Sequence, residues 1–318
     1  MRKGMARAAR ACVLMAACSL AAATAAGGAA SSSAGAPYDV IIEHGRVIDG
    51  TGAPWYSADV GIRAGRIAAI GPLEDAPAKR RIDATGRIVA PGFIDMLGQS
   101  ELTLLVEPHA PSKIFQGITT EITGEGESVA PVNETIAAEQ AARLRHYQLK
   151  RDWSDFSGYF ARLERQGIGI NLASYVGATT VREMVVGYQN RAATAGELER
   201  MQHLVADAMR QGAVGVSSSL EYAPAPYAST EELIALARTA AEFGGIYATH
   251  MRSEQEAIMS ALDETIRIGR EAHIPVEIWH LKAGGVNNFG LMPEIVGHIE
   301  RARAAGIDIA ADTYAYPA

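Results

Sequence analysis

Cysteine is almost absent from this chain of 318 residues: only Cys12 and Cys18 occur, and both lie within the first 26 residues. A chain cleaved after that segment would therefore carry neither a disulfide nor a thiolate metal ligand. Positive charge is also scarce, because 29 Lys and Arg are outnumbered by 36 Asp and Glu, for a net charge of -7. This balance offers no basic patch for a phosphate backbone, so nucleic acid is not expected as a partner.

The first 26 residues have the three-part pattern of a secretory signal peptide. A basic start precedes an apolar, Ala-rich stretch, and Ala23-Thr24-Ala25 offers a small-residue cleavage site. The stretch is too short and too rich in alanine for a stable membrane span. Residues 27–37, rich in Gly, Ala and Ser, would then form a flexible spacer. We expect a periplasmic or secreted protein, with a lipoprotein acylated at Cys18 as the lesser alternative.

Residues 38–90 alternate between apolar and polar side chains, and glycine-containing turns interrupt the pattern. Period-two alternation predicts short strands, so this segment should be a small β module. The predicted strands cover residues 39–43, 45–48, 58–63, 66–70 and 87–89. A module of about fifty residues is marginal alone, and we expect it to need strands from elsewhere in the protein.

After Pro91 the pattern changes to strand, loop and helix, repeated along residues 91–318. Seven predicted strands cover residues 92–96, 119–123, 169–176, 212–217, 245–250, 274–280 and 306–312. Two of the intervening helices should begin with capping boxes, at Thr194 with Glu197 and at Ser229 with Glu232. Such regular alternation favours a parallel (β/α) barrel over a doubly wound sheet.

Two histidines, His250 and His280, each end an apolar strand and begin a polar loop. They are thirty residues apart, about one strand-plus-helix repeat, so they should lie on neighbouring strands and face the same barrel mouth. One strand histidine is usually a hydrogen-bonded core group, but two in matching positions favour metal ligands. A bound metal would supply what amide hydrolysis requires, an activated water and a polarised carbonyl.

Six blocks of the sequence have a familiar pattern: Tyr38-Asp39-Val40-Ile41-Ile42, Gly45-Arg46-Val47-Ile48-Asp49-Gly50, Ala90-Pro91-Gly92-Phe93-Ile94-Asp95, Gly117-Ile118-Thr119-Thr120, Tyr247-Ala248-Thr249-His250-Met251-Arg252 and His280-Leu281-Lys282. The first four resemble the amidohydrolase superfamily, and the last two are similar to its D-aminoacylase (N-acyl-D-amino-acid deacylase) branch. The resemblance implies an α/β fold: an amidohydrolase-type (β/α)8 TIM-like barrel in residues 91–318 and a small β-sandwich portion in residues 38–90. The barrel's eighth strand, with an Asp as general base and acid, is expected beyond Ala318.

The resemblance also suggests the third metal ligand. D-aminoacylases typically carry a cysteine in a Gly-Asn-Cys-Gly-like turn, where this chain has Gly124-Glu125-Gly126-Glu127-Ser128. Glu125 is the expected replacement and Glu127 the alternative, although a solvated loop carboxylate is also a possible reading of Glu125. The His-x-His of the superfamily is Leu97-Gly98-Gln99 here, and neither Leu97 nor Gln99 is a good metal ligand. We therefore expect one Zn²⁺ ion rather than two.

Further residues are candidates for substrate binding. Lys282 follows His280 by two residues and is either an exposed cation or an anchor for a substrate carboxylate, which the resemblance favours. The other candidates, at strand ends or in the barrel mouth, are Tyr222, Arg252, Tyr314 and Gln99. The implied reaction is hydrolysis of a small N-acyl-D-amino acid to a D-amino acid and a carboxylate by a metal-activated water. The alternatives are a cyclic-amide hydrolase similar to dihydroorotase or hydantoinase, and a catalytically inactive binding protein of this fold.

Overall fold

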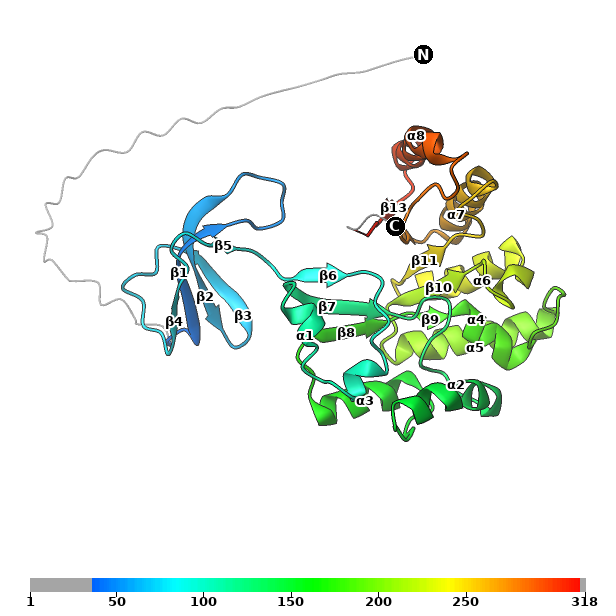
Figure 1. The fold of residues 1–318 in the computed structure, drawn as a ribbon, viewed down its shortest axis with the longest axis horizontal. Helices are drawn as coiled ribbons and strands as arrows, with labels where there is room; N and C mark the ends of the chain where they lie inside the picture. The colour runs from blue at the N-terminus through cyan, green and yellow to red at the C-terminus, as the bar shows by residue number, and fades with distance from the viewer. Residues whose placement is uncertain (1–35, 315–318) are drawn as a thin grey trace, which may run out of the picture. The chain divides into compact units, whose positions relative to one another are not determined.

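The computed structural model describes residues 36–314 (Figure 1). The predicted signal peptide, most of the predicted spacer and Cys18 lie outside these residues. The chain divides between Ala90 and Pro91 into two compact units, which are treated separately below. Among the described residues, no helix combines the length and the apolar character needed to cross a membrane.

The first unit forms one five-stranded sheet in residues 36–90. Its strands are β1 (Val40–Val47), β2 (Tyr56–Arg63), β3 (Arg66–Gly71), β4 (Arg81–Asp83) and β5 (Ile88–Val89). Strand β1 pairs antiparallel with β2 and parallel with β4 and β5, and β3 extends the sheet beyond β2. Two predicted strands, 39–43 and 45–48, are one strand with an irregularity at His44, where φ is 61°. The sequence did not predict β4, because three residues are too few for an alternating pattern to stand out.

The second unit contains parallel strands at all seven predicted positions. They are β6 (Phe93–Asp95), β7 (Ile118–Thr123), β8 (Asn171–Ser174), β9 (Val176–Gly177), β10 (Gly215–Ser219), β11 (Ile246–His250), β12 (Val276–Ile278) and β13 (Ile309–Ala311). The predicted strand 169–176 is interrupted at Tyr175, so β8 joins the sheet β6-β7-β8 and β9 joins the sheet β9-β10-β11-β12-β13. The Tyr175 N–H still donates to Thr123 O at 2.9 Å. The strands follow the order expected of an α/β barrel, and in the described residues they do not close into a ring.

Helices connect the strands and cover their outer side (Figure 1). They are α1 (Pro111–Ile114), α2 (Glu134–His146), α3 (Phe156–Gln166), α4 (Ala178–Val185), α5 (Ala195–Arg210), α6 (Thr230–Ala241), α7 (Ile258–Ala272) and α8 (Met292–Ala304), with short 3-10 turns at Thr103–Leu105, Ala225–Tyr227 and Phe289–Leu291. The capping box predicted at Thr194 and Glu197 is present. The one predicted at Ser229 is half formed: its hydroxyl accepts from Glu232 N, but the Glu232 carboxylate binds Arg182.

The core lies between these helices and the parallel strands. Buried apolar side chains of α5, α6 and α7 pack towards β9, β10, β11 and β12; they include Met201, Val205, Leu233, Leu236, Leu262 and Ile266. Burial of each such side chain contributes about 1.5–3 kcal/mol. This packing holds β9 to β12 side by side, so the loops after β11 and β12 share one edge of their sheet. The loop after β7, which belongs to the other sheet, meets them at Glu125, His250 and His280.

Candidate metal centre

Glu125 lies in a tight turn directly after β7. The glycines on both sides have positive φ, 98° at Gly124 and 68° at Gly126. A Cβ at Gly124 would come within 2.6 Å of Tyr175 O, and one at Gly126 within 2.7 Å of Ser219 N. Both positions therefore require glycine, for conformation as well as space. The turn is also fixed to β10, since the Ser217 hydroxyl donates to Gly124 O and accepts from Gly126 N at 3.1 Å.

The two histidines stand where the sequence predicts them, at the ends of neighbouring strands. His250 is the last residue of β11 and is buried, with 5% of its surface exposed. His280 follows β12 with φ at 40°, a left-handed conformation that is unusual for a residue with a side chain. Its N–H donates to Asp312 Oδ1 at 2.5 Å, and the adjacent Trp279 N–H donates to Thr249 O at 3.0 Å. These bonds hold the His280 ring towards His250.

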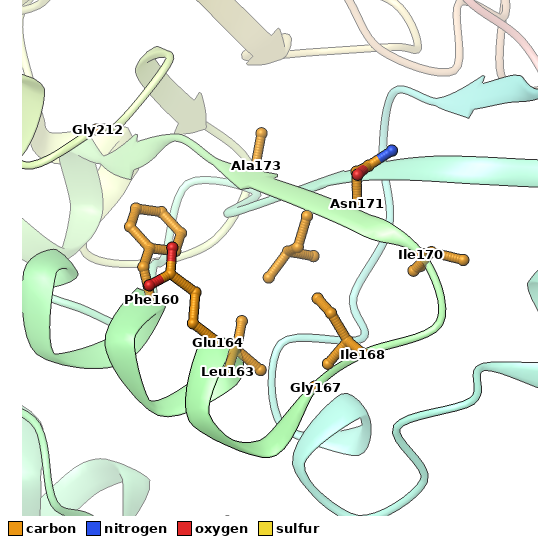
Figure 2. A pocket seen from close by; sticks show the side chains of 10 residues that line it. Phe160, Leu163, Glu164, Gly167, Ile168, Ile170, Asn171, Ala173 and Gly212 are labelled. Carbon is orange, nitrogen blue, oxygen red and sulfur yellow. The ribbon is translucent and has the colours of Figure 1, made fainter. Parts of the chain in front are cut away.

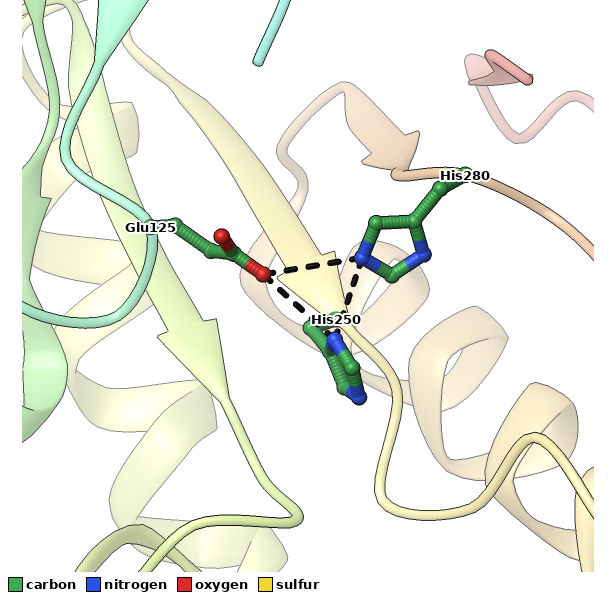
Figure 3. Close-up of side chains that lie close together, drawn as sticks. All are labelled: Glu125, His250 and His280. Carbon is green, nitrogen blue, oxygen red and sulfur yellow. Dashed lines mark hydrogen bonds and ion pairs between the residues drawn. The ribbon is translucent and has the colours of Figure 1, made fainter. Parts of the chain in front are cut away.

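Three donor atoms from these residues form a small triangle (Figure 3). Nδ1 of His250 is 3.0 Å from Nε2 of His280, and Oε1 of Glu125 is 3.4 Å from the first and 3.5 Å from the second. Ligands about 2.0 to 2.2 Å from a tetrahedral zinc ion are about 3.3 to 3.6 Å apart, so the triangle is close to the size that zinc requires. One carboxylate and two imidazoles are also a donor set that zinc accepts. The residues present therefore fit a single metal ion.

Neighbouring side chains orient these donors. Gln99 Nε2 donates to Glu125 Oε2 at 2.8 Å, which leaves Oε1 for the triangle. On the far side of the His280 ring, Nδ1 lies 2.8 Å from Glu254 Oε1. The His250 Nε2 atom is buried without a hydrogen bond, and the Glu221 carboxylate lies 3.4 Å from it.

Protonation in the triangle reflects these contacts. Burial alone would raise the pKa of the Glu125 carboxyl, but hydrogen bonds with His250, His280 and Gln99 outweigh burial and hold this pKa well below its usual value. Burial alone would lower the pKa of His280, yet its contacts with Glu125 and Glu254 raise it to about 9. His280, which would have to be neutral to hold a metal ion, therefore binds a proton firmly in the metal-free protein.

The other predicted site residues are distributed around the triangle. Lys282 Nζ is 3.1 Å from His280 Nδ1 and forms an ion pair with Glu254. Tyr222 lies in the loop after β10, largely exposed, with its ring centre 5.3 Å from that of His250. The Tyr314 ring centre is 5.9 Å from Lys282 Nζ. The structure thus places Lys282 and Tyr222 beside candidate ligands, and Tyr314 beside Lys282.

Arg252 has other partners. Its guanidinium donates to both carboxylate oxygens of Glu264 at 2.8 and 2.9 Å, and to the carbonyl oxygens of Pro226 and Ala228 at 2.9 and 3.0 Å. These bonds use all three of its nitrogens to tie α7 to the loop after β10. In the structure Arg252 thus holds this loop against α7. Its predicted role in substrate binding stays a prediction.

Neither Leu97 nor Glu127 belongs to the triangle. Leu97 packs against the buried cluster of Tyr175, Ala248 and Trp279, which explains an apolar residue at that position. Glu127 is exposed two residues beyond Glu125. It lines two adjoining polar cavities of about 380 and 280 Å³, which also include Gln99 and Glu125. Between the two candidate carboxylates, the structure brings Glu125 to the histidines.

A separate, more apolar cavity of about 470 Å³ lies away from this chemistry (Figure 2). Side chains from α3 and from β8 with the turn before it line it, among them Phe160, Leu163, Ile168 and Ile170. Its lining includes Asn171, Leu172 and Ala173 of β8 but none of the three residues of the triangle. The polar cavities beside Glu125 are therefore the ones relevant to the candidate site.

Three residues that contact the candidate ligands or their turn were not predicted from the sequence: Glu254, Glu221 and Ser217. Glu254 follows His250 by four residues in the same polar loop, so its position near a strand end could have suggested a role. Ser217 is 93 residues from Gly124, and no local pattern shows that these two residues meet.

No protein-family model matches the chain, but known and solved proteins are similar to it. D-aminoacylase of Alcaligenes xylosoxydans xylosoxydans is 42% identical over 286 residues, 89% of this chain and 58% of that protein. A solved D-aminoacylase, studied for its binuclear metal centre with one-metal activation and second-metal attenuation, has 42% identity and a TM-score of 0.79. The matched region covers 88% of this chain and 59% of the D-aminoacylase chain.

A second solved structure is N-acyl-D-glutamate deacylase from Bordetella bronchiseptica, in complex with zinc and a phosphonate that mimics the tetrahedral intermediate. It is 38% identical with a TM-score of 0.81, over 88% of this chain and 59% of that one. This chain spans slightly less than three fifths of the length of these relatives.

Successive parallel strands with a carboxylate and two histidines at their carboxyl ends define the class of this protein, an α/β protein of the amidohydrolase type. Within that class the chain belongs to the D-aminoacylase branch, which also includes the N-acyl-D-glutamate deacylase. The resemblance seen in the sequence is thereby confirmed.

Proposed function

We propose that this protein is a metal-dependent hydrolase of linear amides, which converts an N-acyl-D-amino acid to a D-amino acid and a carboxylate. The observation that carries the proposal is the triangle of Glu125 Oε1, His250 Nδ1 and His280 Nε2, with sides of 3.0 to 3.5 Å. D-aminoacylase and N-acyl-D-glutamate deacylase, which are 42% and 38% identical to this chain, support this substrate class.

The residues have separate roles in this proposal. Glu125, His250 and His280 would hold the ion, which when bound would acidify a water and polarise the acyl carbonyl. Gln99 keeps the Glu125 carboxylate turned towards the histidines. Lys282, with one third of its side chain exposed, presents a cation to the carboxylate of the substrate, and Tyr314 lies beside it. The proton-transfer Asp on an eighth strand stays a prediction from the resemblance.

One zinc ion is proposed rather than two. Leu97 packs into the core, and the Gln99 amide is directed at Glu125, so the pair that replaces His-x-His offers no second set of nitrogen ligands. The D-aminoacylase described as activated by one metal is consistent with a single productive ion.

Location in the periplasm or outside the cell is also proposed, on the sequence of residues 1–26 alone. The test is fractionation of cells that express the protein, with amino-terminal sequencing of the product. Cleavage near Ala25 supports a signal peptide, whereas a Cys18→Ala variant that is no longer held by membranes supports a lipoprotein. An uncleaved cytosolic product contradicts both.

The function is tested by measuring metal content and turnover together. We expect wild-type protein to bind one zinc ion per chain and to hydrolyse N-acetyl-D-amino acids, and His280→Ala to lose both properties. His203→Ala, which removes an exposed histidine of α5, is the matched control and should retain both. Turnover of hydantoin in place of N-acetyl-D-amino acids would favour the cyclic-amide alternative. Absence of zinc together with no effect of His280→Ala would contradict the hydrolase.

A further inference from the structure

Glu254 connects the candidate metal centre to the candidate substrate anchor. It lies in the loop after β11, and only 8% of its side chain is exposed. One carboxylate oxygen, Oε1, is 2.8 Å from His280 Nδ1, and the other, Oε2, pairs with the Lys282 ammonium. A buried carboxylate that contacts a candidate ligand on one side and a cation on the other can influence both.

The same ring nitrogen has a second neighbour. Lys282 Nζ lies 3.1 Å from His280 Nδ1, so a carboxylate and an ammonium both lie within reach of it. A carboxylate can only accept a hydrogen bond and an ammonium can only donate one. If Nδ1 bonds to Glu254, it carries the proton and leaves the Nε2 lone pair of the neutral ring free. If Nδ1 instead accepts from Lys282, the proton of the neutral ring is on Nε2, which then cannot bind a metal.

We propose that Glu254 is a positioning residue that fixes His280 in the Nδ1–H tautomer and keeps the Lys282 ammonium from donating to Nδ1. The inference rests on the metal centre of the proposed function. It gives one carboxylate two tasks: it directs Nε2 of His280 at the ion, and it holds the cation that would bind the substrate carboxylate. Carboxylates that accept from the second nitrogen of a metal-bound histidine act in this way in other metalloproteins.

A purely structural role for the Glu254 side chain is less consistent with its surroundings. The loop is fixed at this point by the backbone, because Glu254 O accepts from Gly284 N at 2.6 Å. The Glu254 N–H is 3.4 Å from the Glu221 carboxylate. Since the backbone provides these contacts, the side-chain carboxylate can be removed while they remain.

The test is a double-mutant cycle read out as zinc affinity, by competition with a chromophoric chelator. Glu254→Ala should weaken zinc binding by about 10- to 100-fold. Glu254→Gln should lose less, because its amide oxygen still accepts from Nδ1–H. Glu256→Ala, an exposed carboxylate of the same loop, is the matched control and should bind zinc as wild type does. Circular dichroism of each variant checks that it is folded.

Lys282→Met separates tautomer selection from simple charge effects. If Lys282 competes for Nδ1 once Glu254 is gone, Lys282→Met should improve zinc affinity about threefold or more in the Glu254→Ala background, relative to its effect in wild type. Equal effects in both backgrounds would overturn the inference, as would a Glu254→Ala variant that binds zinc like wild type. If wild-type protein itself bound no zinc, the metal centre would be wrong and this inference would fall with it.

Discussion

Gln99 Nε2 donates to Glu125 Oε2 at 2.8 Å, while Oε1 of the same carboxylate faces His250 and His280. Gln99, which the family resemblance places where the superfamily has a histidine, therefore contacts the candidate ligand. By the same resemblance Glu125 replaces a cysteine, and the Gln99 amide restricts how the Glu125 carboxylate can rotate.

Removal of this contact should weaken the metal centre. In Gln99→Ala the Glu125 carboxylate loses the bond that fixes its rotation, and we expect zinc affinity to fall about tenfold or more, with a smaller effect on the stability of the metal-free protein. Chelator competition measures the first and urea unfolding the second. Gln116→Ala, which loses an exposed amide bonded to Ser112 O, is the control. Unchanged zinc affinity in Gln99→Ala would show that Glu125 does not need this support.

The Gly124 to Gly126 turn should tolerate no side chain. Gly126→Ala places a Cβ 2.5 Å from the Ser219 Cβ in a left-handed conformation, so strain and overlap act together. Gly244→Ala is the matched control, because Gly244 has a similar φ of 73° and no atom within 4 Å of an added Cβ. Strain alone should cost the control about 1–2 kcal/mol.

We expect Gly126→Ala to exceed this cost by about 1 kcal/mol or more and also to lose zinc, because the Glu125 backbone must shift. Urea unfolding and metal analysis of both variants provide the measurement. Equal stability losses with full zinc content in both would mean that the turn adjusts without moving Glu125.

The buried carboxyl of Glu183 predicts a pH dependence of stability. Glu183 lies in α4 with 4% of its surface exposed, and its Oε1 has no hydrogen-bond partner. Burial, reinforced by the neighbouring carboxyls of Glu139 and Glu127, raises its pKa from 4.5 to about 8. The folded state therefore binds a proton that the unfolded state releases between these two values. Stability from this group is complete below about pH 4.5, falls as pH rises, and levels off above about pH 8.

Glu183→Gln removes this dependence, because an amide does not ionise. The difference in free energy of unfolding, variant minus wild type, should increase by more than about 1 kcal/mol from pH 5.5 to pH 8.5. Denaturant unfolding at both pH values measures the difference, and Glu199→Gln on an exposed position of α5 controls for loss of surface charge. A constant difference between Glu183→Gln and wild type would contradict the raised pKa.

Local sequence patterns predicted the strands and the histidine pair because both depend on short-range features. His250 and His280 follow apolar runs, and the regular strand-helix repeat brings such strand ends together. Glu125 required the family resemblance, since a glutamate between glycines is otherwise a common loop feature. The orientation of its carboxylate by Gln99 could not be predicted, because the contact joins the ends of two strands 26 residues apart.

Errors in the sequence analysis also have physical causes. Residues 169–176 have the apolar pattern of one strand, but the chain changes sheets at Tyr175, and this depends on the strands on either side. At Arg252, the sequence did not indicate that Glu264 of α7 would accept hydrogen bonds from the guanidinium. A partner on a different element decides the role of such a side chain.

The central claim is that Glu125, His250 and His280 bind one zinc ion. Crystals grown with zinc and measured on both sides of the zinc absorption edge would test it most directly. The account predicts one anomalous peak, about 2.0 to 2.2 Å from Glu125 Oε1, His250 Nδ1 and His280 Nε2. A peak bound by other residues, or none at this triangle, would contradict it.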